Sequence, residues 1–287
     1  MKILVTGATG FIGNNLINEL LKDKENKIIA TSRNIEKAKR CDWYNKVDYI
    51  EYDINSKNID IDLYSLFNMP DMLIHLGWEG LPHYNDLIHI EKNLLKNYKF
   101  IKNLIKNGLK DITITGTCLE YGMKNGCLSE NTNPNPSNSY AIAKDTLRKF
   151  IVELNKEFDF SYKWIRLFYM YGDGQSEKSL ISLLDKAIEN SDKEFNMSGG
   201  EQLRDFLHIS EVVKNIVLIV NQKQYTNQAI NCCSGQALSV RTLVENYLKE
   251  RNYNLNLNLG YYPYPNYEAM AFWGDNAKLK KIKGKSK

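Results

Sequence analysis

The sequence predicts an α/β protein with a doubly wound parallel sheet and a smaller, mixed C-terminal lobe. Two patterns carry this prediction. Up to about residue 170, short apolar runs suited to buried strands alternate with longer runs of helical periodicity. Beyond that point the alternation gives way to irregular stretches such as the Tyr- and Pro-rich "YYPYPNYEAMAFW".

The N-terminal segment predicts a strand, a glycine loop and a helix. "KILV" suits a buried parallel strand, and "FIGNNLINELLK" has an apolar stripe at helical spacing. The glycines of the intervening "TGATGFIG" would permit a tight turn, close approach of a pyrophosphate and close helix packing. The helix N-terminus would bind the anion. We therefore predict a Rossmann-type dinucleotide site that includes Gly7, Thr9, Gly10, Phe11, Ile12 and Gly13.

The remaining elements follow in order along the chain. Further strands are expected at residues 26–33, 48–54, 70–78, 111–118 and 161–172. Long helices are expected at residues 87–108 and 139–158. We expect residues 1–170, with a return segment at about 206–235, to form the nucleotide-binding unit, and residues 171–205 and 236–287 to form the second lobe.

Composition and charge agree with a reduced, cytoplasmic protein. No apolar run approaches a membrane span, and no signal peptide precedes "MKILVTG". The net charge of +4 is spread along the chain, so no nucleic-acid partner is expected, and the terminal "KLKKIKGKSK" is interpreted as a solvated tail. The five cysteines form no CxxC pair and the four histidines lack metal spacing, so we expect no metal site.

The end of the second strand bears on the choice of cofactor. An acidic residue there would bind the adenosine ribose hydroxyls of NAD(H). The chain instead has Ser32 and Arg33, whose hydroxyl and guanidinium suit a 2′-phosphate, so NADP(H) is preferred and NAD(H) is the alternative. Asp53 ends the third strand and is either an adenine contact or an ordinary turn residue.

The chemistry is predicted in "SYAIAKDTLRKF". Tyr140 and Lys144 are four residues apart and would share one helix face. An ammonium beside the phenol would lower the pKa of Tyr140 from its ordinary value near 10. Thr117 ends the fifth strand at the side of the sheet that faces ligands, so its hydroxyl is expected beside Tyr140.

Together these motifs resemble the extended short-chain dehydrogenase/reductases of the nucleotide-sugar epimerase/dehydratase group. "TGATGFIG", "DMLIHLGW", the Thr117–Tyr140–Lys144 set, "GGEQLRDFLHISEVV" and "INCCSG" carry the resemblance over nearly the whole chain. It implies cofactor contacts at Asp53, Ile54, Leu76, Gly77, Trp78, Asn93, Thr115, Tyr140, Lys144 and Phe168. It implies substrate contacts at Trp78, Thr117, Tyr169, Leu180 and Arg204, with Arg204 on the sugar-linked phosphates. For Trp78 and Tyr169, core packing is an equal alternative.

Departures from the family pattern narrow the reaction. The related 4,6-dehydratases have an Asp-Glu pair where this chain has Cys118 and Leu119, so water elimination is not expected. Glu120 is expected to point to the other side of the strand. Tyr169 replaces an Asn of the family, and Cys233 replaces a glycine. The nearest resemblance is to the small NAD(P)H-dependent reductases of nucleotide-linked 4-keto-6-deoxy sugars.

The expected reaction is therefore NADPH-dependent reduction of the C4 keto group of such a sugar, a hexose or heptose linked to dTDP, GDP or CDP, in bacterial surface-polysaccharide biosynthesis. Two alternatives stay open. One is an NAD-dependent nucleotide-hexose 4-epimerase, which Arg33 disfavours, and the other is a non-catalytic NADP-sensing protein, which the intact Thr–Tyr–Lys set disfavours. The resemblance also implies a homodimer through the helices at about 86–107 and 139–158.

Overall fold

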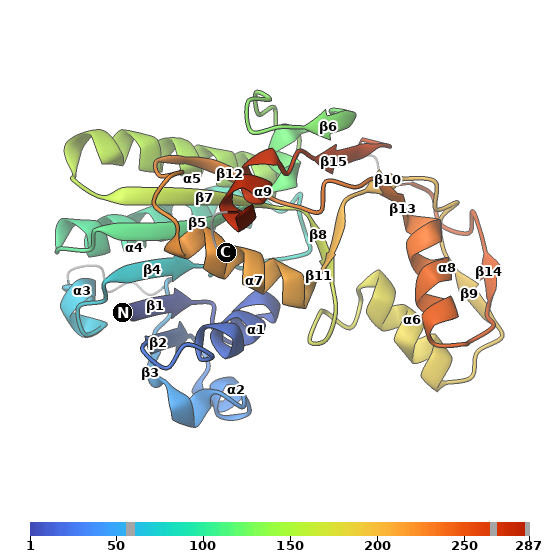
Figure 1. Ribbon diagram of the computed structural model, residues 1–287, viewed down its shortest axis with the longest axis horizontal. Helices are drawn as coiled ribbons and strands as arrows, with labels where there is room; N and C mark the ends of the chain where they lie inside the picture. The colour runs from blue at the N-terminus through green and yellow to red at the C-terminus, as the bar shows by residue number, and fades with distance from the viewer. Residues whose placement is uncertain (56–60, 265–268, 285–287) are drawn as a thin grey trace.

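The computed structural model describes residues 1–55, 61–264 and 269–284. Its centre is a seven-stranded sheet in which every pairing is parallel (Figure 1). From one edge to the other, the strands are β12 (Gln228–Cys232), β7 (Ser161–Leu167), β5 (Asp111–Thr117), β4 (Met72–His75), β1 (Lys2–Thr6), β2 (Lys27–Ser32) and β3 (Asp48–Glu51). This sheet confirms the predicted fold class.

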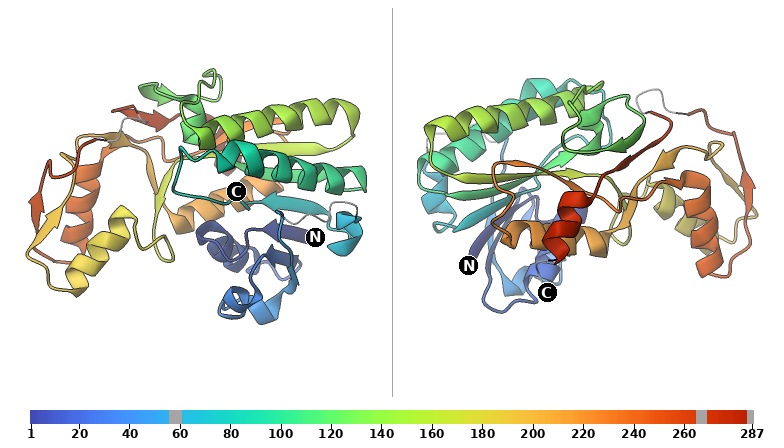
Figure 2. Two further views of the ribbon diagram at one scale, coloured as in Figure 1. Left: turned by 180° about the vertical axis from the view of Figure 1, so that it is seen from behind. Right: turned by 45° about the horizontal axis from the view of Figure 1, so that its top comes forward.

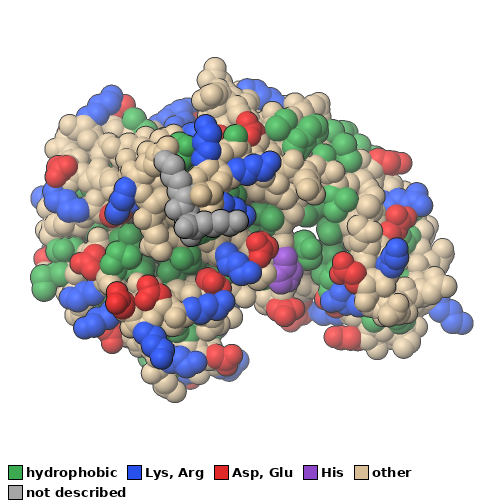
Figure 3. Space-filling model, in the orientation of Figure 1, with side chains coloured by type: hydrophobic (Ala, Val, Ile, Leu, Met, Phe, Trp, Pro, Cys, Tyr) green, Lys and Arg blue, Asp and Glu red, His purple; other side chains and the backbone are tan. Residues whose placement is uncertain are grey.

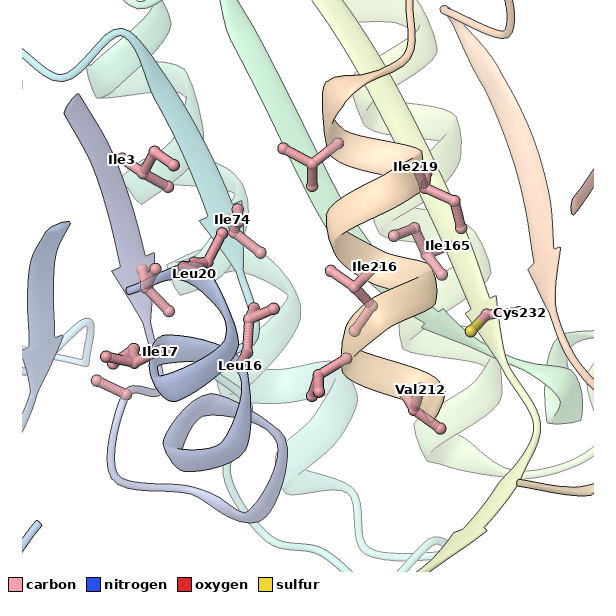
Figure 4. Close-up of a cluster of buried hydrophobic side chains, with 14 of the residues drawn as sticks. Ile3, Leu16, Ile17, Leu20, Ile74, Ile165, Val212, Ile216, Ile219 and Cys232 are labelled. Carbon is pink, nitrogen blue, oxygen red and sulfur yellow. The ribbon is translucent and has the colours of Figure 1, made fainter. Parts of the chain in front are cut away.

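Side chains alternate between the two faces of the sheet, and helices cover both faces. On β1, Ile3 packs with α1 (Phe11–Leu20) and α7 (Ile209–Asn221), whereas Leu4 packs with α4 (Leu95–Lys106). The helix α5 (Ser139–Glu157) lies beside α4 on the Leu4 face. Figure 4 shows Leu16 of α1 and Ile216 of α7 in the core on the Ile3 face. Burial of both faces explains why β1, β2 and β4 are nearly continuous aliphatic runs.

The strand order places a ligand crevice beside the glycine loop. The chain runs outward from β1 to β2 and β3, and then crosses back to β4 on the other side of β1. In open parallel sheets, such a reversal leaves a crevice beyond the carboxyl ends of the two strands that flank it, here β1 and β4. The strands of the central sheet run toward the side where the second lobe lies (Figure 1).

The second lobe is a small mixed unit with its own core. Two helices, α6 (Leu180–Glu189) and α8 (Val240–Glu250), pack around Leu184, Phe195 and Val244. Its parallel pair joins β9 (Glu194–Asn196) to β14 (Asn256–Asn258), and its antiparallel pair joins β10 (Leu203–Arg204) to β13 (Leu238–Ser239). The views of Figure 2 show this lobe set to one side of the sheet.

Two further strand pairs lie between the sheet and the second lobe. β8 (Tyr169–Tyr171) pairs in parallel with β11 (Phe206–His208), and β6 (Gly126–Leu128) pairs in parallel with β15 (Phe272–Gly274). The single strand predicted over residues 161–172 is therefore two strands, because the chain leaves the central sheet after β7 and joins β11. Short helices are α2 (Ile35–Lys39) and α3 (Leu63–Leu66).

Two more expectations differ from the structure. The helix predicted from residue 87 begins with a π-helical segment, His89–Leu94, before α4. The terminal basic run is not a solvated tail as far as it is described, because α9 (Ala277–Gly284) buries Leu279 and Ile282 in the core beside α7. Thus α9, predicted in the second lobe, packs on the nucleotide-binding unit; the lobe boundaries otherwise stay predictions.

Candidate functional site

The glycine loop has the shape that a dinucleotide pyrophosphate requires. Gly7 has a positive φ of 66°, and an added Cβ there would meet the backbone of Gly77 at 3.0 Å. A side chain at Gly13 would collide with the Gly7 carbonyl oxygen. Within the described residues, no side chain caps the N-terminus of α1, which follows Gly10. These features fit a bound pyrophosphate at the helix N-terminus.

A hydroxyl joins the first loop to the one after β4. Thr6 Oγ1 accepts hydrogen bonds from the backbone N–H groups of Leu76 at 3.1 Å and Gly77 at 3.2 Å. Ile54 packs against the same glycine, because a Cβ at Gly77 would lie 2.9 Å from the Ile54 Cδ1. The structure therefore brings together three of the predicted cofactor positions.

The predicted adenosine end contains an ion-pair cluster that the sequence reasoning missed. Arg33 forms an ion pair with Glu79, which follows β4. The Ser32 hydroxyl hydrogen-bonds to the hydroxyl of Tyr49 at 2.9 Å. Asp53 accepts a hydrogen bond from the backbone N–H of the residue two positions on, so it acts as a turn residue in this structure.

The predicted catalytic side chains converge at the carboxyl end of β5. Thr117 is the last residue of β5, and Tyr140 and Lys144 are buried in the first turns of α5. Asn138 caps this helix by accepting from the N–H of Ala141 at 2.9 Å. The Thr117 hydroxyl accepts a hydrogen bond from the backbone N–H of Leu119 at 3.2 Å, and it lies close enough to the Tyr140 phenol to lower the pKa of that group.

The ammonium of Lys144 is held beneath the strand ends. Its Nζ donates to the carbonyl oxygen of Thr115 at 2.9 Å. The Thr115 hydroxyl in turn donates to the carbonyl of His75 at 3.2 Å. Lys144 is only 2% exposed. Thr115 therefore positions Lys144 through its backbone carbonyl, and its contact with the cofactor stays a prediction.

Burial changes the acid–base properties of both groups. It lowers the pKa of Lys144 to about 7, with the nearby Glu120 acting in the opposite direction. Burial also raises the pKa of Tyr140 above its ordinary value, and the nearby Thr117 hydroxyl only partly opposes this. The expectation that Lys144 lowers the pKa of Tyr140 is not met in this structure, because burial raises that pKa and the nearby Tyr84, Glu120 and Cys118 side chains raise it further.

An aromatic wall encloses the Tyr–Lys pair. The Trp78 ring centroid lies 4.2 Å from the Lys144 Nζ, and the Trp78 and Tyr140 rings meet edge to face at 6.0 Å. The indole N–H donates to His89 Nδ1 at 3.1 Å. His89 is fully buried and contacts Tyr140, a neighbour that sequence reasoning also missed. Asn93, predicted as a cofactor contact, donates from Nδ2 to the Glu79 carbonyl at 2.9 Å.

The residues after Thr117 form a 3₁₀ turn rather than a strand. Cys118 and Leu119 begin this turn, so the expected orientation of Glu120 by strand alternation is wrong. Glu120 is fully buried; its carboxylate accepts from Arg166 Nε at 2.7 Å and Trp164 Nε1 at 2.9 Å. A carboxylate locked in this way is not available to exchange a proton with a substrate.

The predicted substrate residues fall into two groups. Tyr169 joins Tyr140 in one apolar cluster, which also holds Phe168, a predicted cofactor contact. The Arg204 Cζ lies 5.6 Å from the Tyr169 ring centroid. Arg204 is buried, and its Nη1 donates to the Met270 carbonyl at 3.1 Å. Leu180 belongs instead to the core of the second lobe. Figure 3 shows the surface indented between the sheet unit and that lobe.

The described residues also bear on metal binding and membrane insertion. Among them, no group of His, Cys, Asp and Glu side chains could hold a metal ion. No helix in the described part of the chain is both long and apolar enough to cross a membrane.

The parallel sheet, glycine loop and buried Tyr–Lys pair define a nucleotide-cofactor-dependent protein of the extended short-chain dehydrogenase/reductase type. The chain belongs to the NAD dependent epimerase/dehydratase family, whose sequence profile matches residues 3–233.

Relatives of the chain act on nucleotide sugars. It is 30% identical over 275 residues to a dTDP-6-deoxy-L-talose 4-dehydrogenase (NAD(+)) from Aggregatibacter actinomycetemcomitans, covering 96% of this chain and 99% of the relative. It is 28% identical to a dTDP-4-dehydro-6-deoxyglucose reductase from Escherichia coli, covering 85% of this chain and 79% of the relative. The names of both relatives describe oxidoreductases that act on nucleotide-linked 6-deoxy sugars.

Solved structures share the fold. The UDP-glucose 4-epimerase of Thermotoga maritima, determined with UDP-glucose, superimposes with a TM-score of 0.85 at 21% identity, over 98% of this chain and 92% of that one. MoeE5 in complex with UDP-glucuronic acid and NAD gives a TM-score of 0.84 at 23% identity, over 99% of this chain and 93% of that one.

Proposed function

We propose that this protein reduces the C4 keto group of a nucleotide-linked 4-keto-6-deoxy sugar, with NADPH preferred and NADH as the alternative. The observation that carries the proposal is the buried Thr117–Tyr140–Lys144 set at the end of β5, followed by Cys118 and Leu119. A relative named as a reductase of a 4-dehydro sugar and another named as a 4-dehydrogenase support it, because the two names describe the same type of oxidoreduction written in opposite directions.

Tyr140, Thr117 and Lys144 would each have a different role in the transfer of a proton to the sugar. The nicotinamide cofactor would supply the hydride when bound. Tyr140 would donate its proton to the carbonyl oxygen of the sugar, and the Thr117 hydroxyl would hold that oxygen through a second hydrogen bond. The ammonium of Lys144 would stabilise the phenolate left behind and contact the ribose of the cofactor. A raised phenol pKa keeps Tyr140 protonated, which is the form that a reductase needs.

The same geometry disfavours the elimination reaction of the family. Dehydration needs an acid and a base that both reach the sugar. Cys118 is buried beside the Tyr140 cluster, and Glu120 is fixed in its ion pair with Arg166. Arg204 is the proposed anchor for the diphosphate, so that binding energy remote from C4 orients the sugar.

We further propose a homodimer that pairs through α4 and α5. Leu95 at the start of α4 is 48% exposed, and Ile142 on α5 is 39% exposed. Pairing across a two-fold axis would bury both. A cytoplasmic location is proposed because all five cysteines, each within the described ranges, are free thiols.

The test is a panel of 4-keto-6-deoxy sugars linked to dTDP, GDP and CDP. Purified protein should consume NADPH, and more slowly NADH, only when one of these sugars is present, and Tyr140→Phe should abolish most of that consumption. An epimerase would instead interconvert two sugars without net consumption of cofactor. A cofactor-binding sensor would bind NADPH and turn over none of the panel.

A further inference from the structure

Glu79 joins three neighbouring parts of the cofactor-binding edge. One carboxylate oxygen pairs with the Arg33 guanidinium, directly after β2. The other accepts from Asn55 Nδ2, after β3, at 3.0 Å, and from Lys92 Nζ, before α4, at 3.1 Å. The Glu79 side chain is about one-quarter exposed, whereas that of Arg33 is 60% exposed. The carboxylate is therefore the more fixed partner of the pair.

This arrangement concerns the end of β2, where the cofactor's adenosine ribose is recognised. A guanidinium at this position can accept the 2′-phosphate that distinguishes NADP(H) from NAD(H). In this chain, however, Arg33 already has a carboxylate against it. A 2′-phosphate at Arg33 would have to displace Glu79 or lie beside it, and each phosphate carries about one and a half to two negative charges.

We propose that Glu79 is a specificity-determining residue that competes with the cofactor 2′-phosphate for Arg33 and Lys92, and so limits the preference for NADPH over NADH. This inference rests on the cofactor assignment of the proposed function. In this chain, which lacks an acid at the end of β2, the negative charge that favours NADH over NADPH would come from the loop after β4. The pKa of the Glu79 carboxyl is held below its usual value, chiefly by Arg33, so the competing charge is present at neutral pH.

Glu79→Gln is expected to raise the affinity for NADPH, because it makes the cluster more positive. Arg33, Lys92 and Glu79 together carry one net positive charge, and Glu79→Gln raises this to two. Removal of one like charge a few ångströms from a phosphate is worth on the order of tenfold in affinity at low salt. NADH lacks the phosphate, so its affinity should change by about twofold or less.

The experiment is direct titration of the purified protein with NADPH and with NADH, without any sugar. In Glu79→Gln, the NADPH dissociation constant should fall about tenfold, and the gain should shrink as salt is added. The gain should also be smaller when Arg33→Met is combined with it. The matched control is Glu91→Gln, which removes an exposed acid beside Lys92 and should leave both affinities unchanged.

Several outcomes would overturn the inference. If Glu79 is only a structural clamp, Glu79→Gln will weaken both cofactors equally. An unchanged NADPH affinity, or an equal gain in Glu91→Gln, would also contradict it, as would failure of the wild type to bind either cofactor. Because the readout is binding, a protein that reduces no sugar on the panel could still confirm the role of Glu79, and this separates the two proposals.

Discussion

Replacement of Lys144 by methionine should make the protein more stable while it removes activity. Lys144 is buried, and its pKa of about 7 lies far below the ordinary value of 10.5. That difference corresponds to roughly 4–5 kcal/mol of folding free energy that the wild type loses when the amine is charged. Methionine fills a similar volume and carries no charge.

The gain in folding stability expected for Lys144→Met should decrease as the pH rises. Below about pH 7 the amine is charged in both the folded and the unfolded chain, so the full burial cost applies. Between about 7 and 10.5 only the unfolded chain binds the proton, so the wild type becomes more stable as the pH rises. The advantage of Lys144→Met should therefore be largest at pH 6–7 and should vanish near pH 10.

Two lost contacts reduce the net effect. The ammonium donates to the Thr115 carbonyl and rests against the Trp78 ring, which together are worth about 1–3 kcal/mol. We therefore expect Lys144→Met to raise the free energy of unfolding by about 2–3 kcal/mol at pH 7. Lys149→Met is the matched control, because Lys149 lies on the same helix with a mostly exposed side chain and should change stability by less than about 0.5 kcal/mol.

Urea unfolding at pH 6, 7, 8.5 and 10 measures the effect. A variant no more stable than the wild type at pH 7, or a difference that stays constant with pH, would refute the reasoning. In the same variant the cofactor affinity and the rate should both fall, because the ammonium is proposed to serve both.

Further changes test the other parts of the site. Tyr140→Phe should lower kcat by about 10²–10⁴-fold with cofactor affinity nearly unchanged, and Thr117→Val should cost less; retention of most reductase activity by Tyr140→Phe would refute its role. Glu120→Gln leaves Arg166 buried without its counter-charge and should cost about 3–5 kcal/mol in urea unfolding. The rate should decline as the pH rises through the pKa of Lys144, which a pH–rate profile would detect. Light scattering at micromolar concentration should show a dimer, and a monomer would contradict pairing through α4 and α5.

The parts of the fold predicted from sequence are those encoded by local patterns. The glycine loop, the strand ends and the four-residue spacing of Tyr140 and Lys144 each depend on neighbours within one turn or one strand. Residues 161–172 show the limit of this approach. They read as one continuous strand because no turn-forming residue interrupts them before Gly172. The chain nevertheless turns away at Phe168, where pairing with β12 ends and pairing with β11 begins. The competing partner lies too far along the chain to leave a local signal.

The missed site residues have the same explanation. The roles of Glu79 and His89 could not be predicted from the sequence, because they depend on partners far along the chain. Arg33, for example, lies 46 residues before Glu79. The orientation expected for Glu120 was wrong because strand alternation was assumed to continue past Thr117, where the chain forms a 3₁₀ turn. Its true orientation is set by Arg166, which lies 46 residues later and donates to its carboxylate. Only the folded chain brings such charges together.

His75, at the end of β4, and Lys144, on α5, are two buried basic side chains with different roles. His75 lies between the Thr6 hydroxyl at 2.9 Å and the Asn97 amide oxygen at 2.8 Å. Burial, with the nearby Lys144 ammonium, lowers the pKa of His75 to about 3, so the ring stays neutral across the physiological range. Lys144, with a pKa of about 7, changes charge within that range. A titration of cofactor affinity near neutral pH that disappears in Lys144→Met would therefore belong to the lysine that lies against Trp78. His75 instead fixes Thr6, which joins the loop after β1 to the loop after β4.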